Sequence, residues 1–435
     1  MINILLVCDY SPWDQHVGSR RWARFIPALA TLGVSFNVLA PRWTVGQSCE
    51  EEKSLAESSV AVRRWDVVSP RVAAWQFRKR APFVQSRGSN PVTTAFPPSV
   101  SALVIKRRVI RFINQYYFPD VSWHVTDNAV RTGLSAIEKS RPHLIIASHP
   151  FCGSLQIGFE LSKRTGIPWV ADMRDGWSTY HLSMFRSSTR LSTKLARFER
   201  TILDSASLVT SATTGVDRGL ECSHNRRAVV YTGYAPAIFS DNSKAEESNN
   251  TLNLAIAGSV TEVHDTDTLL LGLKLFLQRQ PLCCQINYYG NYFGALLLQA
   301  QRFDIPETSF TNRGFLPIEE LLPALHKADC LVALGMKGTR GGAYASARIF
   351  DYFAAKRPIL AASEYDNELT AMVGSIPGCF HCSTTESVAT TLERIYQSKQ
   401  THGRLELNEA ALKAIMKWSI EGQAVKMATA LKANG

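Results

Sequence analysis

Residues 346–360 place an acidic and a basic side chain at the start of a predicted helix, where they suit a phosphorylated ligand that carries hydroxyl groups. The sequence there is Ser-Ala-Arg-Ile-Phe-Asp-Tyr-Phe-Ala-Ala-Lys-Arg-Pro-Ile-Leu, and Ile349 and Phe353 recur at the spacing of one helix face. Arg348 and Asp351 are then expected on the rim, beside free backbone N–H groups that favour an anion. A carboxylate there suits a sugar hydroxyl. An ordinary surface ion pair explains the same residues about equally well.

The same segment resembles the donor-binding helix of GT-B glycosyltransferases, above all the family 4-like group, whose members carry the run Lys-[Ile/Leu]-Phe-Glu-Tyr-Leu-Ala-x-Gly-[Lys/Arg]-Pro-[Ile/Val]. Arg348 stands at the position of the Lys, and Asp351 at that of the Glu, which in the family binds the ribose of a nucleotide sugar. The resemblance implies that Ser346, Ile349 and these two residues bind the donor. Ala343 stands where the wider family has a second Glu that contacts the transferred sugar, so the sugar contacts should differ.

A second group of candidate residues follows a short apolar segment that predicts a buried parallel strand. These residues are Asp172, Arg174, Asp175 and Trp177. The carboxyl ends of such strands are where open α/β sheets bind ligands. A guanidinium there can hold phosphate oxygens in a bidentate geometry, and a carboxylate can orient the guanidinium or an acceptor hydroxyl. The alternative is a buried Arg–Asp pair that only fastens the loop.

The run that contains these residues, Val-Ala-Asp-Met-Arg-Asp-Gly-Trp, resembles the Val-Ala-Asp-Phe-Arg-Asp-Pro-Trp signature of a family 4-like subgroup. Members outside that subgroup often have His at the position of Arg174, in contact with the transferred sugar. We therefore assign Arg174 and Asp175 to catalysis, and Asp172 and Trp177 to acceptor binding.

Two further loops follow predicted strands in the same half of the chain. His149 lies in a loop that opens a helix and is our third catalytic candidate, although a lone His more often makes a structural hydrogen bond. The loop after the first strand enters a helix near Gly18, and glycine permits close approach of the backbone to a substrate. Its resemblance to the first loop of the family implies acceptor binding by Gly18, Ser19 and Arg20. A plain strand-to-helix connection is the alternative.

The loop from Gly258 to Asp267 lies between a predicted strand and a predicted helix in the second half of the chain. Its N–H groups and hydroxyls can cradle a diphosphate, but an ordinary capped helix start has the same composition. Family members usually carry basic residues in this loop, whereas here only His264 can substitute, and Lys337 or Arg340 on a later loop can supply the missing charge. The donor candidates of these loops are Gly258, Ser259, Thr261, His264 and Arg340.

The overall composition is that of a globular protein, with 45% hydrophobic and 20% charged residues, which excludes disorder as the main state. No apolar stretch reaches about 18 residues, and the first segment turns polar at Asp9, so we expect a cytoplasmic protein without a signal peptide. Nine scattered cysteines do not make a disulfide framework. Cys379 and Cys382 have the spacing of a metal or redox motif, but no second pair completes it, and we expect packed thiols and no metal.

The formal charge of +11 implies affinity for an acidic partner. Basic and aromatic residues are dense in the predicted helix 106–118, which suits an anionic membrane surface, although a solvated helix face over a core is the commoner explanation. The segment 67–100 is too long for a plain connection and is predicted to be a functional or mobile loop. We expect no nucleic acid among the partners.

Strand-length apolar segments alternate with helical patterns in two series, which predicts an α/β protein with two doubly wound parallel sheets. The polar stretch Thr232–Asn250 separates the series. We expect an acceptor-binding domain over residues 1–235, a linker over 236–250, a nucleotide-sugar-binding domain over 251–400, and a helical segment 401–435 that crosses back to the first domain. The predicted strands are 2–7, 35–39, 144–147, 169–172 and 208–210, then 252–257, 285–289, 330–334 and 358–361.

The resemblance covers residues 1 to about 418 in short motifs. It implies a GT-B fold in which two Rossmann-like domains face a central cleft. It also implies a retaining, metal-independent transfer of a sugar from a nucleotide diphosphate sugar to a hydroxyl group. The acceptor would be a saccharide or a lipid-linked molecule at the inner face of the membrane. Two alternatives remain, a sugar-nucleotide epimerase of the same fold and a catalytically silent GT-B subunit that binds a partner. Ala343 and the base-poor loop favour the silent subunit.

Overall fold

The computed structural model describes residues 2–13, 18–42, 61–66, 126–150, 152–178, 189–236, 251–261, 263–281, 283–337, 345–403 and 405–434. Outside these ranges lie the whole of the expected loop 67–100, the expected helix 106–118, most of the expected linker 236–250, Arg340 and Ala343. The described residues form two compact units, residues 2–233 with 420–434 and residues 234–419. Each unit is described by itself below.

The first unit is built on a seven-stranded sheet whose paired strands are all parallel, in the order β3-β2-β1-β4-β5-β6-β7. Since β1 and β4 are neighbours while the chain winds outward from β1 to β3, the strand order reverses between them. Ligands of open α/β sheets bind at such a reversal. The strands are β1 (Ile2–Cys8), β2 (Val34–Arg42), β3 (Ala61–Asp66), β4 (Leu144–Ser148), β5 (Trp169–Met173), β6 (Leu208–Ser211) and β7 (Arg227–Val229).

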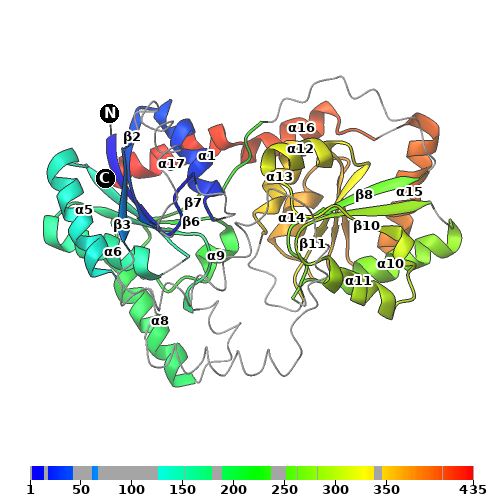
Figure 1. Cartoon of the computed structure of the whole chain (residues 1–435), viewed down its shortest axis with the longest axis horizontal. Helices are drawn as coiled ribbons and strands as arrows, with labels where there is room; N and C mark the ends of the chain where they lie inside the picture. Colours follow the sequence, from blue (N-terminus) through cyan, green and yellow to red (C-terminus); the bar gives the residue numbers. More distant parts are fainter. Residues whose placement is uncertain are drawn as a thin grey trace. The chain divides into compact units, whose positions relative to one another are not determined.

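Helices cover both faces of this sheet (Figure 1). Leu5 and Val7 belong to a core with side chains of α5, α6 and α8, whereas Ile4 and Leu6 alternate to the opposite face and pack with α1 and α17. The helix α17 thus brings the end of the described chain back onto the first unit. The helices are α1 (Arg20–Ala30), α5 (Asp127–Ser140), α6 (Cys152–Thr165), α8 (Thr189–Asp204), α9 (Thr214–Arg218) and α17 (Ile420–Asn434).

The second unit holds a six-stranded parallel sheet in the order β10-β9-β8-β11-β12-β13, the doubly wound order of dinucleotide-binding folds. The order reverses between β8 and β11, so the loops that follow these two strands meet at one edge of the sheet. The strands are β8 (Leu252–Ala257), β9 (Cys284–Tyr289), β10 (Phe310–Asn312), β11 (Cys330–Leu334), β12 (Ile359–Ala362) and β13 (Phe380–Cys382).

Helices α10, α11 and α15 contribute to the core on one side of the second sheet. Helix α13 is buried along residues 349–355 and begins directly at the carboxyl edge described above. The helices are α10 (Thr266–Arg279), α11 (Phe293–Arg302), α12 (Ile318–His326), α13 (Arg348–Ala355), α14 (Glu368–Gly374), α15 (Thr385–His402) and α16 (Glu409–Ile415), with short 3-10 turns η3 (Glu307–Ser309) and η5 (Met416–Trp418).

The predicted strands match the inner strands of both sheets and omit the four edge strands, β3 and β7 in the first unit and β10 and β13 in the second. The reason is physical, because an inner parallel strand is buried on both faces and reads as an apolar run, whereas an edge strand has a partner on one side only. The edge strands are accordingly short or mixed in sequence, such as Arg-Ala-Val in β7.

Two further observations concern membrane-spanning helices and cysteines in the described part of the chain. No helix in the described part is long and apolar enough to cross a membrane. The eight cysteines in the described part of the chain are free thiols.

Candidate functional site

The carboxyl edge of the first sheet brings together the loops that the sequence marked as acceptor-binding and catalytic. Gly18, Ser19 and Arg20 follow β1 and open α1, and His149 follows β4. The backbone N–H of His149 donates to the carbonyl of Asp172 at the end of β5, with an N···O distance of 2.9 Å. Because the Arg174 guanidinium also donates to the carbonyl of Gly18, residues from the loops after β1, β4 and β5 converge at this edge of the sheet.

Asp172 is at the centre of a buried polar network. Arg21, which is fully buried, donates to both carboxylate oxygens of Asp172 at 3.1 and 2.8 Å. The hydroxyls of Ser148 and Thr210 donate to the same carboxylate at 2.9 and 2.7 Å, and Arg21 also donates to the carbonyl of Val230 at 2.8 Å. The two bonds from Arg21 and the two from the hydroxyls occupy the acceptor positions of the carboxylate. The geometry therefore favours a positioning role for Asp172 over direct contact with an acceptor.

Sequence reasoning missed Arg21 and named its neighbour Arg20, which is half-buried at the start of α1. It considered a buried Arg–Asp pair as an alternative but located it between Arg174 and Asp175. The signal that points to Arg21 is weak, because its partner is 151 positions away. The pair joins α1 to β5, so it holds the first loop against the exit of β5.

Trp177 and His149 are buried rather than exposed to a ligand. Trp177 is fully buried in the core, with its ring 6.2 Å from that of His149 and 5.8 Å from that of Phe198. Two of the four candidate residues at this strand exit, Asp172 and Trp177, are therefore fully buried. The acceptor role of Trp177 stays a prediction.

Arg174 and Asp175 are half-buried at the same exit, as a candidate pair for chemistry requires. The Arg174 guanidinium donates to the carbonyl of Gly18 in the first loop. Burial lowers the pKa of Arg174 and raises the pKa of Asp175, while the attraction between the two charges opposes both shifts. The arrangement places a partly desolvated positive charge beside the first loop, where its interaction with an anion is strengthened.

The segment that follows β5 contacts a buried acid that the sequence did not single out. Glu199 of α8 is fully buried, and its Oε2 accepts the backbone N–H of Ser178 at 3.0 Å. Within the described part of the chain its Oε1 has no hydrogen-bond partner. Burial raises the pKa of Glu199 to about 7, although hydrogen bonds from Ser178 act in the opposite direction.

The Glu199→Gln variant should be more stable than the parent above neutral pH. The pKa of Glu199 is about 4.5 in the unfolded chain and about 7 in the folded protein, so folding takes up a proton between these pH values. The stability that the protonated side chain contributes below pH 4.5 is therefore lost as the pH rises to about 7. Because Gln cannot ionise, we expect a gain of about 1–3 kcal/mol in unfolding free energy at pH 8 and a gain of less than about 1 kcal/mol at pH 5. Urea unfolding at both pH values measures this, with the exposed Glu138→Gln as control; equal effects at both pH values would contradict it.

At the carboxyl edge of the second sheet, the loop after β8 meets the start of α13. Arg348 donates to the carbonyl of Ser259 at 2.7 Å, and a Cβ atom added to Gly258 would lie 2.9 Å from the Arg348 guanidinium carbon. Gly258 also has a φ of +90°, which disfavours any other residue. The glycine therefore lets a guanidinium lie directly over the loop. The structure brings these three predicted donor residues together.

His264 does not supply the positive charge that the sequence analysis sought in this loop. Its Nδ1 accepts the N–H of Thr261 at 3.1 Å. Burial, together with repulsion from Arg348, lowers the pKa of His264 to about 4, so the imidazole is neutral at physiological pH. Its role in the structure is to fix the loop, and Arg348 carries the positive charge.

Asp351 is 2% exposed, and this corrects its expected place on the rim of the helix. Helix α13 is enclosed all round, and Ile349 is fully buried in it, while Ser346, just before the helix, is half-buried. Sequence reasoning gave no role to Tyr352, whose hydroxyl accepts the N–H of Ala257 at 2.9 Å and donates to a carbonyl of β11 at 3.0 Å. Tyr352 thereby fixes the helix at the reversal of strand order.

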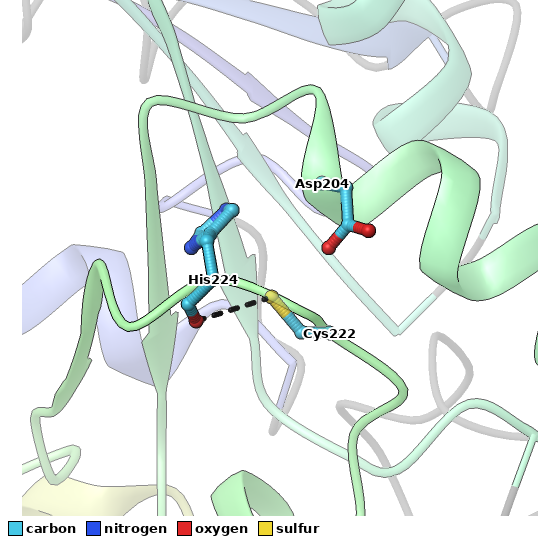
Figure 2. Close-up of side chains that lie close together, drawn as sticks. All are labelled: Asp204, Cys222 and His224. Atoms are coloured by element: carbon cyan, nitrogen blue, oxygen red, sulfur yellow. Dashed lines mark hydrogen bonds between the residues drawn. The ribbon is translucent and has the colours of Figure 1, made fainter.

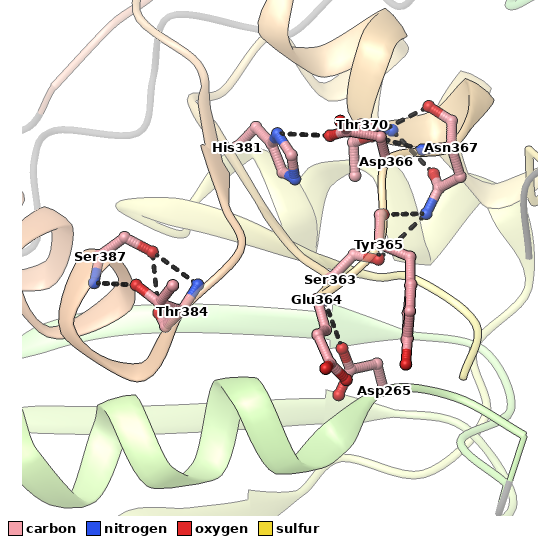
Figure 3. A network of polar contacts seen from close by, with 10 residues as sticks. All are labelled: Asp265, Ser363, Glu364, Tyr365, Asp366, Asn367, Thr370, His381, Thr384 and Ser387. Carbon is pink, nitrogen blue, oxygen red and sulfur yellow. Dashed lines mark hydrogen bonds and ion pairs between the residues drawn. The ribbon is translucent and has the colours of Figure 1, made fainter. Parts of the chain in front are cut away.

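The acidic residues near this loop have partners of their own. Asp265 caps α10 and accepts the N–H of Glu364 at 2.6 Å (Figure 3). Asp267 pairs with Lys337 at 2.8 Å. The Asp267–Lys337 pair borders a cavity of about 400 Å³, together with Glu364 and Tyr365. Lys337 is thus engaged by Asp267, which disfavours the suggestion that it supplies the charge missing from the loop.

Comparisons with solved structures agree with this architecture. Similar structures include Anabaena HepE in complex with UDP and glucose (TM-score 0.61, 14% identity, 100% of both chains covered) and a glycosyltransferase from Rickettsia africae ESF-5 (0.60, 11%, 99% of this chain and 98% of the other). Sucrose-phosphate synthase from Thermosynechococcus elongatus is also similar, with a TM-score of 0.60 and 12% sequence identity, and the match covers 100% of this chain and 99% of the other.

The chain has the GT-B fold. The two carboxyl edges described above are those of the two Rossmann-like sheets of this fold. No model of a known protein family matches the sequence, and no curated protein matches it. At these identities the likeness establishes the fold, and the family 4-like assignment stays a prediction.

Proposed function

We propose that this protein transfers a sugar from a nucleotide diphosphate sugar to a hydroxyl of a saccharide or lipid-linked acceptor, in the synthesis of a cell-surface polysaccharide or glycoconjugate. The observation that carries the proposal is the meeting of the Gly258 loop with Arg348 at the start of α13, where the strand order of the second sheet reverses. Asp351 lies in the first turn of the same helix. The GT-B fold, shared with a HepE structure that contains UDP and glucose, supports this choice of ligand.

In the proposed reaction the second unit holds the leaving diphosphate. Arg348 and the first N–H groups of α13 provide positive charge where a diphosphate would lie over Gly258. Stabilisation of the charge that develops on the leaving group is the main catalytic contribution expected of such a site. We assign Arg174 and Asp175 of the first unit to the acceptor or to a phosphate oxygen, and propose retention of configuration without a metal.

The Asp351→Asn variant is expected to bind the nucleotide about 10- to 150-fold more weakly, through the loss of roughly 1.5–3 kcal/mol of hydrogen bonding to the ribose. Isothermal titration with the preferred nucleotide measures the change. Asp267→Asn is a matched control, because Asp267 is an acid of the same unit that pairs with Lys337. If Asp351 is only structural, its variant will melt at a lower temperature and bind the nucleotide with unchanged affinity.

The proposed function as a whole is tested with a panel of UDP-, GDP- and ADP-sugars. One of them should raise the melting temperature of the protein, and the same donor should be consumed faster when an acceptor is present. Consumption without an acceptor and with change of the sugar would instead identify an epimerase. Binding without any turnover would identify a silent subunit, and absence of binding by every donor would overturn the proposal.

A further inference from the structure

Three side chains with different metal-binding atoms lie together at the carboxyl end of α8, and the proposed reaction uses none of them. Asp204 ends α8, and Cys222 and His224 come from the segment between α9 and β7 (Figure 2). One ligand atom from each residue lies within 4.8 Å of the others, and all three residues are half-buried. They form the one cluster of three such ligands found among the described residues.

The combination of a thiol, an imidazole and a carboxylate suits a borderline-soft ion such as Zn²⁺. In a tetrahedral zinc site, metal–ligand distances place the donor atoms roughly 3.4–3.6 Å apart. The three atoms here, which lie within 4.8 Å of one another, would need to close by at most about 1.4 Å, which rotation of half-buried side chains allows. Three protein ligands leave a fourth position for water.

Backbone hydrogen bonds already orient all three ligands. The Cys222 Sγ donates to the carbonyl of His224 at 3.9 Å (Figure 2). The His224 Nδ1 accepts the N–H of Arg226 at 3.2 Å, so Nε2 carries the proton and donates to the carbonyl of Leu203 at 3.2 Å. A metal-bound His commonly donates its second ring N–H to a backbone carbonyl in this way. The Asp204 Oδ1 accepts the N–H of Ser223 at 2.6 Å. An ion would take one ring nitrogen of His224 in place of its backbone partner, and would bind the other oxygen of Asp204.

We propose that Asp204, Cys222 and His224 form a Zn²⁺ site. The ion joins the end of α8 to the segment that leads into β7, an edge strand of the first sheet. Because edge strands have a partner on one side only, a tie at this point stabilises the first unit. The site is independent of the proposed sugar transfer, since its residues contact neither predicted donor nor predicted acceptor residues in any bond described above.

The test is a titration of the full-length reduced protein with Zn²⁺ in competition with a chromogenic chelator. We expect one equivalent of Zn²⁺ per chain, and a loss of affinity of at least about tenfold in Cys222→Ser and in Asp204→Asn. Asp204→Asn can keep the bond from the Ser223 N–H, so it should fold even where Cys222→Ser does not. Cys283→Ser is the matched control, because Cys283 is also half-buried and donates to the Tyr396 hydroxyl at 3.3 Å.

Cobalt substitution gives a second readout. Co²⁺ bound to the parent should show a thiolate charge-transfer band that Cys222→Ser lacks and Cys283→Ser keeps. The proposal is overturned if the parent binds no stoichiometric Zn²⁺, or if Cys222→Ser binds it as tightly as the parent does. If Asp204→Asn binds Zn²⁺ as tightly as the parent, the carboxylate is not a ligand and the proposed three-residue site is overturned.

Discussion

The Asp172→Asn variant is expected to lose about 3–5 kcal/mol of unfolding free energy, because it leaves the fully buried Arg21 guanidinium without its counter-charge. Arg21 donates twice to Asp172, and two hydroxyls complete the carboxylate, so no other acid in these bonds can replace it. Denaturant unfolding at pH 7 measures the loss. The exposed Asp127→Asn, at the start of α5, is a control expected to change stability by less than about 1 kcal/mol.

Two further measurements separate the ion pair from a general packing effect. Adding Arg21→Met to the Asp172 variant should recover part of the loss, because the uncompensated charge is then removed. Burial alone would raise the pKa of Asp172, but attraction to Arg21 and three hydrogen-bond donors outweigh it and lower the pKa below its ordinary value. The stability that the parent gains from this pair is therefore present at neutral pH and lost in acid. A loss below about 1 kcal/mol for Asp172→Asn would contradict this account.

The Arg174→Lys variant is expected to lower turnover by roughly 10- to 1,000-fold with little change in melting temperature. Lys keeps the charge but loses the planar fork that binds phosphate oxygens bidentately. Turnover is measured with the donor found in the nucleotide-sugar panel. Arg200→Lys is a matched control in the same unit, because the Arg200 side chain is 56% exposed and forms an ion pair with Glu221. It should leave turnover unchanged.

The structure also offers a structural role for Arg174, because its guanidinium donates to the carbonyl of Gly18 and so ties the exit of β5 to the first loop. That role predicts the reverse result. Arg174→Lys would then melt at a lower temperature and keep its activity per folded molecule. Measuring both quantities on one preparation decides between the two roles, and a large stability loss with normal specific activity would remove Arg174 from the site.

The sequence by itself determined the fold class and the inner strands, because hydrophobic periodicity is a local property. Strand-length apolar runs predicted nine strands of the two sheets, and helical spacing after Ala345 predicted the helix that the structure shows at Arg348–Ala355. The parallel, doubly wound order follows from the alternation of strands and helices. Edge strands escaped this reasoning because partial burial leaves no clear period.

Tertiary structure alone decided which polar side chains meet. The sequence suggested Arg174 and Asp175 as a buried pair, whereas the buried ion pair joins Arg21 to Asp172. His264 is neutral because it is buried beside Arg348, and Asp351 lies inside a helix enclosed on all sides. Such pairings depend on the order of strands in the sheet, which brings together loops that are far apart in the sequence. Burial and charge then set each pKa, and neither can be inferred from local sequence.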